Sequence, residues 1–241
     1  KMAGLSEKQM LKTLEKFNTP TVGNVVATFG DRDPLCLSLY DPWHGRWYTD
    51  QSLRCIYPEL GPRIGYALTV VYSLPDPNYK RWTFNDLIDA LDKAKKPIVV
   101  VAQQDFPPDI LPRNGLFGGI MSATFKACGV VGVVTNGPSR DVDEIRGMGI
   151  QYLMSGVTSG HGHFAIRAIN VPVSVAGMDV APGELVHMDE NGACKFPADR
   201  LADVCQNVVK MTAMEEEWAS AILKAKTAAE VKAAFATGKR K

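Results

Sequence analysis

The sequence lacks the features of several protein classes. No apolar run approaches the roughly 20 residues that a membrane-spanning helix needs, and the beginning of the chain shows no apolar signal segment. The five cysteines are scattered and include no CxxC pair, which argues against a disulfide framework and for a reducing compartment. The net charge is only +1, so neither nucleic acid nor an acidic membrane surface is an expected partner. These absences predict a soluble, cytoplasmic protein.

Familiar catalytic motifs are missing as well. The chain contains no GxxxxGK(S/T) loop, no GxGxxG and no GxSxG, which argues against a P-loop, a dinucleotide fingerprint and a hydrolase nucleophile elbow. The four histidines suggest no catalytic triad. His161-Gly162-His163 places two imidazoles close together, but no third metal ligand follows at an obvious spacing. A flexible loop is therefore favoured there over a metal site.

The middle of the chain has the pattern of an α/β fold. β-Branched, apolar segments typical of buried strands occupy residues 65–73, 97–102 and 130–134. Helical patterns separate these strands at 83–94 and 120–128. Strands that alternate with helices indicate βαβ units.

The two ends of the chain are expected to be helical. Apolar residues recur at helical spacing over 6–17, a second short helix is predicted over 22–30, and the pattern is helical again from Pro197 onward. We find no internal repeat and no linker. Residues 1–241 are therefore predicted to form a single domain with N-terminal helices and a helical C-terminal extension at about 198–241.

The segment 34–62 is rich in proline, tryptophan and tyrosine and has no regular pattern. Large apolar patches rarely face solvent. We expect this segment to pack over the core or against another subunit.

The glycine pair Gly118-Gly119 stands where a helix can begin. With Ile120 and Met121 it could present backbone N–H groups at a helix N-terminus, where the helix dipole favours an anion. The alternative is a tight loop that binds nothing. Both interpretations fit the sequence of this segment.

A tight turn at 136–139 follows the strand at 130–134 and delivers Arg140, Asp141 and Glu144 together. Mg²⁺ prefers carboxylate oxygens and keeps several waters, and arginine can bind a carboxylate in bidentate fashion. These residue types therefore favour a metal site with an anionic substrate. The alternative is a helix start with Asp141 near the N-cap, Glu144 three residues later and Arg140 in a surface ion pair.

The spacing of these residues resembles a known family. Gly119, twenty residues, Arg140-Asp141, two residues and Glu144 match the G-X20-R-D-X2-E/D pattern of RraA-like proteins, which are grouped with class II pyruvate aldolases. NTPTVGNVVATFG and VPVSVAGMDVAPGELVHMDENGACKFP are similar to two further elements of that family. The resemblance covers roughly residues 15–205. The sequence departs from the family pattern at several positions, among them Gly119, where the best-known aldolases carry an acidic residue.

The resemblance implies a fold and a function. The fold would be a single-domain β/β/α swivelling-type sandwich, assembled as a homotrimer or homohexamer with active sites between subunits. The activity would be that of a lyase: cleavage of 4-hydroxy-4-methyl-2-oxoglutarate-type substrates, decarboxylation of oxaloacetate, or both, through a pyruvate enolate. The alternative within the same family is a non-catalytic regulator that binds a ribonuclease or another protein.

The resemblance also assigns roles to individual residues. The 2-oxo acid would bind to Arg140 and to backbone groups of Gly118, Gly119, Ile120 and Met121. Arg140 would be catalytic. Mg²⁺ or Mn²⁺ would be held by Asp141, with Glu144 at the second acidic position.

Overall fold

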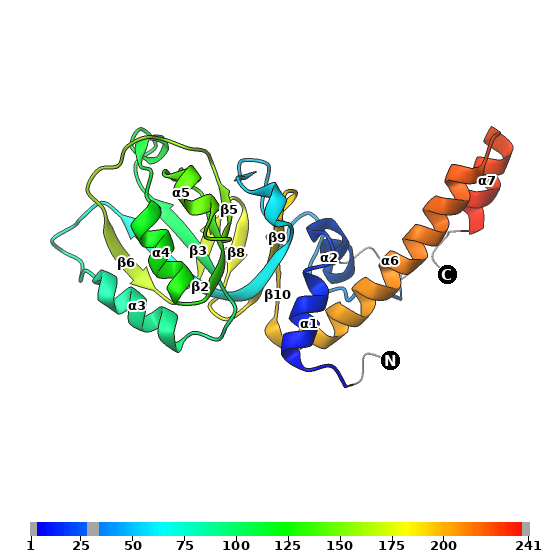
Figure 1. Cartoon of the computed structure of the whole chain (residues 1–241), viewed down its shortest axis with the longest axis horizontal. Coiled ribbons are helices and arrows are strands. Elements are labelled where there is room, and N and C mark those ends of the chain that lie inside the picture. The colour runs from blue at the N-terminus through cyan, green and yellow to red at the C-terminus, as the bar shows by residue number, and fades with distance from the viewer. Residues whose placement is uncertain (1–3, 28–33, 238–241) are drawn as a thin grey trace. The chain divides into compact units, whose positions relative to one another are not determined.

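The computed structural model describes residues 4–27 and 34–237, which form two compact units (Figure 1). One unit comprises residues 46–198 and contains a mixed sheet. The other is helical and combines residues up to Gly45 with those from Asp199 onward. The prediction of one domain over 1–241 stays a prediction. The sheet unit holds every residue that the sequence assigns to the candidate site.

The sheet of the larger unit has eight strands, with the order β1-β5-β4-β3-β2-β9-β10, and β6 pairs with β2 beyond this path. Strands β2, β3, β4 and β5 run parallel to one another, whereas β1, β6, β9 and β10 pair antiparallel with the strands beside them. The strands are β1 (Arg54–Cys55), β2 (Arg63–Ser73), β3 (Ile98–Asp105), β4 (Val130–Thr135), β5 (Gln151–Met154), β6 (Ala165–Ile169), β9 (Leu185–Asp189) and β10 (Gly192–Phe196). A two-stranded sheet is formed by β7 (Val173–Val175) and β8 (Met178–Val180).

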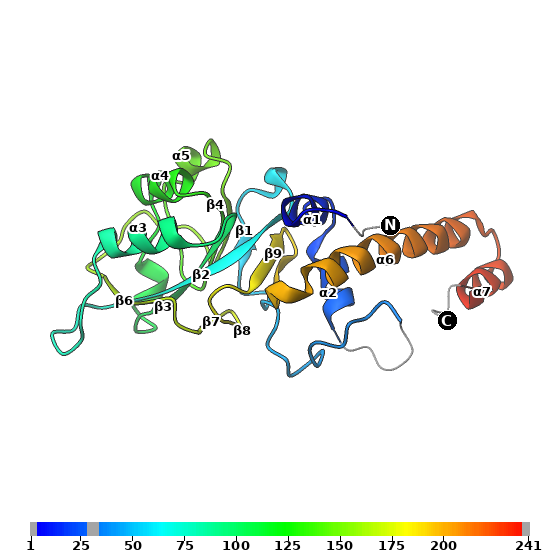
Figure 2. The same ribbon diagram turned by 90° about the horizontal axis from the view of Figure 1, so that it is seen from below.

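The central strands are apolar on both faces because both faces are covered. Helices α3 (Phe84–Lys93), α4 (Gly119–Ala127) and α5 (Val142–Arg146) lie on one side of the sheet and β7–β8 on the other (Figure 2). Leu68 of β2 packs in the core on the helical side, whereas its neighbour Ala67 packs in the core formed with β7 and β8. The layers are therefore β/β/α, which confirms the predicted fold class.

Local sequence signals explain where the helices of this unit begin. Thr83 caps α3 with a capping box, in which its hydroxyl accepts from the Asp86 N–H and the Asp86 carboxylate accepts from the Thr83 N–H. Helix α4 starts at a glycine cap, Gly118, which offers no side chain to its first N–H groups. Those groups are therefore open to other partners.

The helical unit consists of α1 (Glu7–Leu14), α2 (Thr19–Val26), α6 (Leu201–Lys224) and α7 (Ala228–Thr237). Helix α6 contacts each of the other three, and Trp218 packs against Phe235 between α6 and α7. The prediction of a helix over 22–30 is wrong at its start, because Asn18 caps α2 and Pro20 lies in its first turn, where proline is tolerated. The helix ends at Val26; the predicted end, Gly30, lies outside the described residues.

No helix in the described ranges is both long enough and apolar enough to cross a bilayer.

Candidate active site

All seven residues that the sequence assigns to the site line one cleft of about 470 Å³. We call it the Gly118 cleft. Its polar end contains the start of α4 and the turn that enters α5, and its other wall is largely aromatic and aliphatic. The lining residues are Tyr72, Arg81, Trp82, Phe84, Leu116, Gly118, Gly119, Ile120, Met121, Arg140, Asp141, Glu144, His161, Phe164, Ala165 and Ile166.

The turn after β4 is tied to the neighbouring segments by hydrogen bonds. Asn136 pairs with the backbone of Gln104 at the end of β3: its Oδ1 accepts from the Gln104 N–H at 2.7 Å and its Nδ2 donates to the Gln104 carbonyl at 3.0 Å. The Arg140 N–H donates to the Phe117 carbonyl at 3.1 Å, and the Ser139 hydroxyl donates to the same oxygen. The turn therefore holds Arg140 against the segment that enters α4.

Asp141 links the two helix starts. It is the N-cap of α5 in a left-handed conformation, with φ 58°, yet its side chain makes no capping bond to α5. Its Oδ2 instead accepts from the Gly119 N–H at 2.9 Å. A side chain used only to cap its own helix would bond within α5. The structure therefore excludes the simple capping interpretation of Asp141.

Two backbone donors at the start of α4 remain available. Among the described residues, the N–H groups of Ile120 and Met121 have no hydrogen-bond partner, and the first bond of the helix runs from Ser122 to Gly118. Both residues line the Gly118 cleft. Unpaired N–H groups at a helix N-terminus form an anion site.

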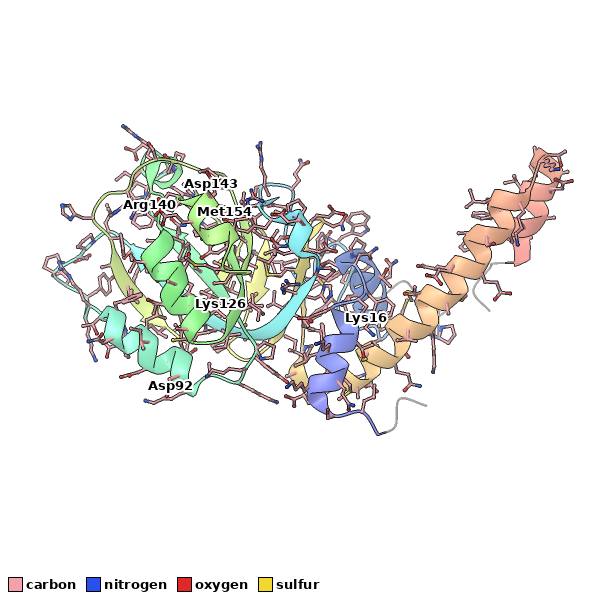
Figure 3. All side chains as sticks on the ribbon, viewed as in Figure 1. Lys16, Asp92, Lys126, Arg140, Asp143 and Met154 are labelled. Carbon is pink, nitrogen blue, oxygen red and sulfur yellow. The ribbon has the colours of Figure 1, made fainter. Side chains whose placement is uncertain are left out.

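Arg140 lines the Gly118 cleft. It is labelled beside α4 in Figure 3. Its side chain is one-third exposed, and its Nε lies 3.9 Å from Asp141 Oδ2. That Nε is buried and has no hydrogen-bond partner within the described part of the chain. A Cβ on Gly118 would lie 3.0 Å from Nε and 3.2 Å from Nη2, so the glycine makes room for the guanidinium. Arg140 thus forms a long ion pair with Asp141, and its unused donor leaves the guanidinium available to an anionic ligand as well.

The two carboxylates of the site converge on Gly119. A Cβ on this glycine would collide with Glu144 Oε2 and would lie 3.9 Å from Asp141 Oδ2. Within the described ranges, no three His, Cys, Asp or Glu side chains form a group that could hold a metal ion. Mg²⁺ is commonly held by one or two carboxylates with retained waters, so this pair fits such a cation. The same donor set is too small for structural Zn²⁺.

Gly119→Ala is expected to move Glu144 out of the cleft. The new methyl group would occupy the position of Glu144 Oε2, which is the free end of a flexible side chain and can move at little cost. We expect Mg²⁺ affinity to fall about as much as in Glu144→Gln, with a nearly unchanged melting temperature. Calorimetric titration of Mg²⁺ into both variants tests this. An unchanged affinity in Gly119→Ala would show that Glu144 does not act from its observed position.

Tyr57 holds the start of α5 in place. Its hydroxyl donates to the Val142 carbonyl at 2.7 Å, directly after Asp141 in the chain. Burial raises the pKa of Tyr57 to about 12, although nearby Arg146 lowers it. Because the neutral phenol is favoured in the folded state, its contribution to stability is complete below pH about 10 and is lost as the pH rises toward 12.

Tyr57→Phe is expected to lower the free energy of unfolding by about 1 kcal/mol near neutral pH, because it leaves the Val142 carbonyl without this donor. Urea denaturation at pH 7 measures the loss. A second series above pH 10 should show the difference between the two proteins narrowing as the wild-type phenol ionises. A constant difference at all pH values would contradict this role of the hydroxyl.

Sequence reasoning missed two exposed basic residues of the Gly118 cleft, Arg81 and His161. Both are exposed and come from segments far from 118–144 in the chain. In the sequence, His161 stands out only together with His163, which is not among the lining residues. The ring of His161 packs on Phe164 at 5.8 Å between centroids. No sequence motif indicates that either residue belongs to the site, because only the fold brings them to the cleft.

Similar proteins support this picture of the fold. Solved structures include a protein from Pseudomonas syringae pv. tomato of uncharacterized function, with 20% identity, a TM-score of 0.72 and coverage of 96% of this chain and 95% of that chain. Another is RraAS2 of Streptomyces coelicolor, which is described as an unusual member of the RNase ES inhibitor RraA protein family. It has 20% identity and a TM-score of 0.60, and the match covers 88% of this chain and 96% of that chain.

Curated relatives match over shorter stretches. Protein DlpA of Legionella pneumophila is 28% identical over 167 residues, which is 68% of this chain and 26% of that protein. A protein of Halalkalibacterium halodurans, provisionally named 4-hydroxy-4-methyl-2-oxoglutarate aldolase, is 28% identical over 104 residues, or 43% of this chain and 50% of that protein. The chain thus spans about a quarter of the length of protein DlpA and about half the length of the Halalkalibacterium halodurans protein. Residues 36–194 match the family described as RraA-like: Aldolase/RraA, and the chain belongs to that family.

Proposed function

We propose that this protein is a divalent-metal-dependent carbon–carbon lyase that acts on 2-oxo acids through a pyruvate enolate. The observation that carries the proposal is the convergence of Arg140, both carboxylates and the free N–H groups of α4 on one cleft. A relative provisionally named as an aldolase supports the same class. The substrates would be oxaloacetate, aldols of the 4-hydroxy-4-methyl-2-oxoglutarate type, or both.

The residues of the cleft divide the work between binding and charge stabilisation. The N–H groups of Ile120 and Met121 would hold the substrate carboxylate. Asp141 and Glu144 would hold Mg²⁺ or Mn²⁺, which as a Lewis acid polarises the 2-oxo group. As the C3–C4 bond breaks, its electron pair becomes the enolate: oxaloacetate loses CO₂, and an aldol, whose C4 hydroxyl gives up its proton, loses a carbonyl product. A proton from solvent then converts the enolate to pyruvate. Arg140 would stabilise the negative charge that develops on the enolate oxygen.

The aromatic wall would exclude water from this step. Tyr72 is fully buried, and burial raises its pKa, so its hydroxyl stays neutral. Phe84, Phe164 and Ile166 complete an apolar surface opposite the charged end. Low polarity around the reacting atoms strengthens the electrostatic contribution of Arg140.

Pyruvate release from oxaloacetate tests the proposal. The purified protein with Mg²⁺ should release pyruvate faster than heat-denatured protein with the same Mg²⁺, and excess EDTA should abolish the difference. The denatured control is needed because free Mg²⁺ is present in both samples, so any pyruvate release that does not require folded protein is the same in the two. Equal rates in the two samples, for oxaloacetate and for an aldol substrate, would leave the alternative of a non-catalytic regulator that binds a ribonuclease or another protein.

We also propose a cytoplasmic homotrimer or homohexamer, with no nucleic acid or membrane partner. The aliphatic side chain of Ile120, which lines the cleft at the start of α4, is 84% exposed. A second subunit over this edge would bury it. Light scattering at micromolar concentration should give three or six times the monomer mass of 26.3 kDa, and a monomer would contradict the assembly.

A further inference from the structure

A second cavity of about 380 Å³ lies beside the Gly118 cleft. It is lined by Asp109, Ile110, Arg113, Asn114, Gly160, His161 and Gly162, and we call it the Asn114 cavity. His161 lines both spaces. The two loops that form it are joined by a hydrogen bond of 2.8 Å from the Gly115 N–H to the Gly160 carbonyl. The cavity is therefore part of the folded framework around the cleft.

Asn114 is the unusual residue of this cavity. It is 2% exposed, yet neither Nδ2 nor Oδ1 has a hydrogen-bond partner among the described residues. A buried polar group left unpaired costs about 1–3 kcal/mol, so buried amides are nearly always paired. A bound molecule that offers both an acceptor and a donor would satisfy the two atoms.

The charges around Asn114 narrow the chemistry of that molecule. Arg113 is exposed on the same cavity and has no ion-pair partner in the described part of the chain, so it is available to an anion. Asp109 also lines the cavity and can accept from a hydroxyl group. A carboxylate next to a hydroxyl matches this set: the carboxylate accepts from Asn114 Nδ2 and Arg113, and the hydroxyl donates to Asn114 Oδ1 or Asp109.

We propose that the Asn114 cavity binds a hydroxy-carboxylate group. Because Asn114 precedes Gly118 by four residues, their Cα atoms are at most about 14 Å apart. A single ligand that passes His161 could therefore place one end at Asn114 and the other at the start of α4. Such a ligand would be a long 2-oxo acid with its distal end in the Asn114 cavity, so this last step rests on the proposed function. Binding of a hydroxy-carboxylate group to the cavity does not depend on the proposed function.

NMR titration with small probes tests the binding. The Asn114 side-chain NH₂ signals, assigned with Asn114→Ala, are followed as glycolate, acetate or acetamide is added. We expect glycolate to shift them with a Kd about tenfold lower than that of acetate, the equivalent of one added hydrogen bond. Preferential binding of acetamide, or no shift with any probe at tens of millimolar, would overturn the proposal; the second result would mean that water alone pairs with Asn114.

Variants separate the cavity from the cleft. Asn114→Ala and Arg113→Gln should each abolish the shifts that glycolate causes at the Gly160 and Gly162 backbone signals, without lowering the melting temperature. Arg140→Lys, which alters only the cleft, should leave those shifts unchanged. If the protein releases no pyruvate from oxaloacetate but glycolate still binds at Asn114, the proposed function fails and the cavity assignment stands. Glycolate shifts that persist in Asn114→Ala would refute the assignment.

Discussion

Arg140→Lys is expected to lower kcat for oxaloacetate decarboxylation by about 10²–10³, the typical loss for one preorganised donor to a developing oxyanion. Lysine keeps the positive charge but loses the planar fork that can donate two parallel hydrogen bonds. The backbone of Arg140 is held by the turn after β4, and the room for its guanidinium comes from Gly118. A shorter point charge would not reach the same position. Steady-state pyruvate release at saturating Mg²⁺ measures the loss.

The matched control is Arg146→Lys in α5. Arg146 is half-exposed and pairs with Glu59, away from the Gly118 cleft. Exposed pairs contribute about 0–1 kcal/mol, so this variant should keep its turnover. Thermal melts should be similar for both variants and the wild type, because neither arginine fills the core. Near-full turnover in Arg140→Lys would contradict the proposed role of Arg140.

The central fold could be predicted from sequence because its signals are local. The apolar run 130–134 became β4 (Val130–Thr135), and Thr83 caps α3 as its position before a helical pattern indicates. The short strands β6, β8 and β10 were not individually predicted. Strands of three to five residues carry little periodicity. Pairing with the distant strand β2 decides β6, whereas β8 and β10 form short hairpins with β7 and β9, their neighbours in the chain.

The polar half of the site could be predicted for a related reason. Arg140, Asp141 and Glu144 are close in sequence, and Gly119 follows from the family spacing. The orientation of Asp141 could not be predicted, since its bond to the Gly119 N–H spans 22 residues. The role of Asn114 could not be predicted either, because it depends on the burial of a side chain that has no hydrogen-bond partner among the described residues. A sequence shows which groups are polar, but only the folded chain shows which are left unpaired.

Asp141 carries the second large expected effect, and two substitutions separate its two roles. Asn tolerates the left-handed backbone at this position, and its side-chain oxygen can still accept from the Gly119 N–H. Asp141→Asn should therefore fold normally but lose one negative charge beside Glu144. Loss of a metal ligand or of its supporting partner typically costs 10–100-fold in affinity, and we expect a decrease of about that size for Mg²⁺.

Asp141→Ala should add a structural defect to the loss of metal affinity. It leaves the Gly119 N–H without its acceptor and places a residue with no polar side chain in a left-handed conformation, which costs roughly 1–2 kcal/mol. Its melting temperature should fall below that of Asp141→Asn, whereas Mg²⁺ binding should be weak in both.

Asp143→Asn is the matched control, because Asp143 is exposed on α5 and does not line the cleft. Calorimetric Mg²⁺ titration and thermal melts of all three variants test the scheme. Wild-type Mg²⁺ affinity in Asp141→Asn would refute a role for Asp141 in holding the metal, and the carboxylate would then serve only to join the two helix starts.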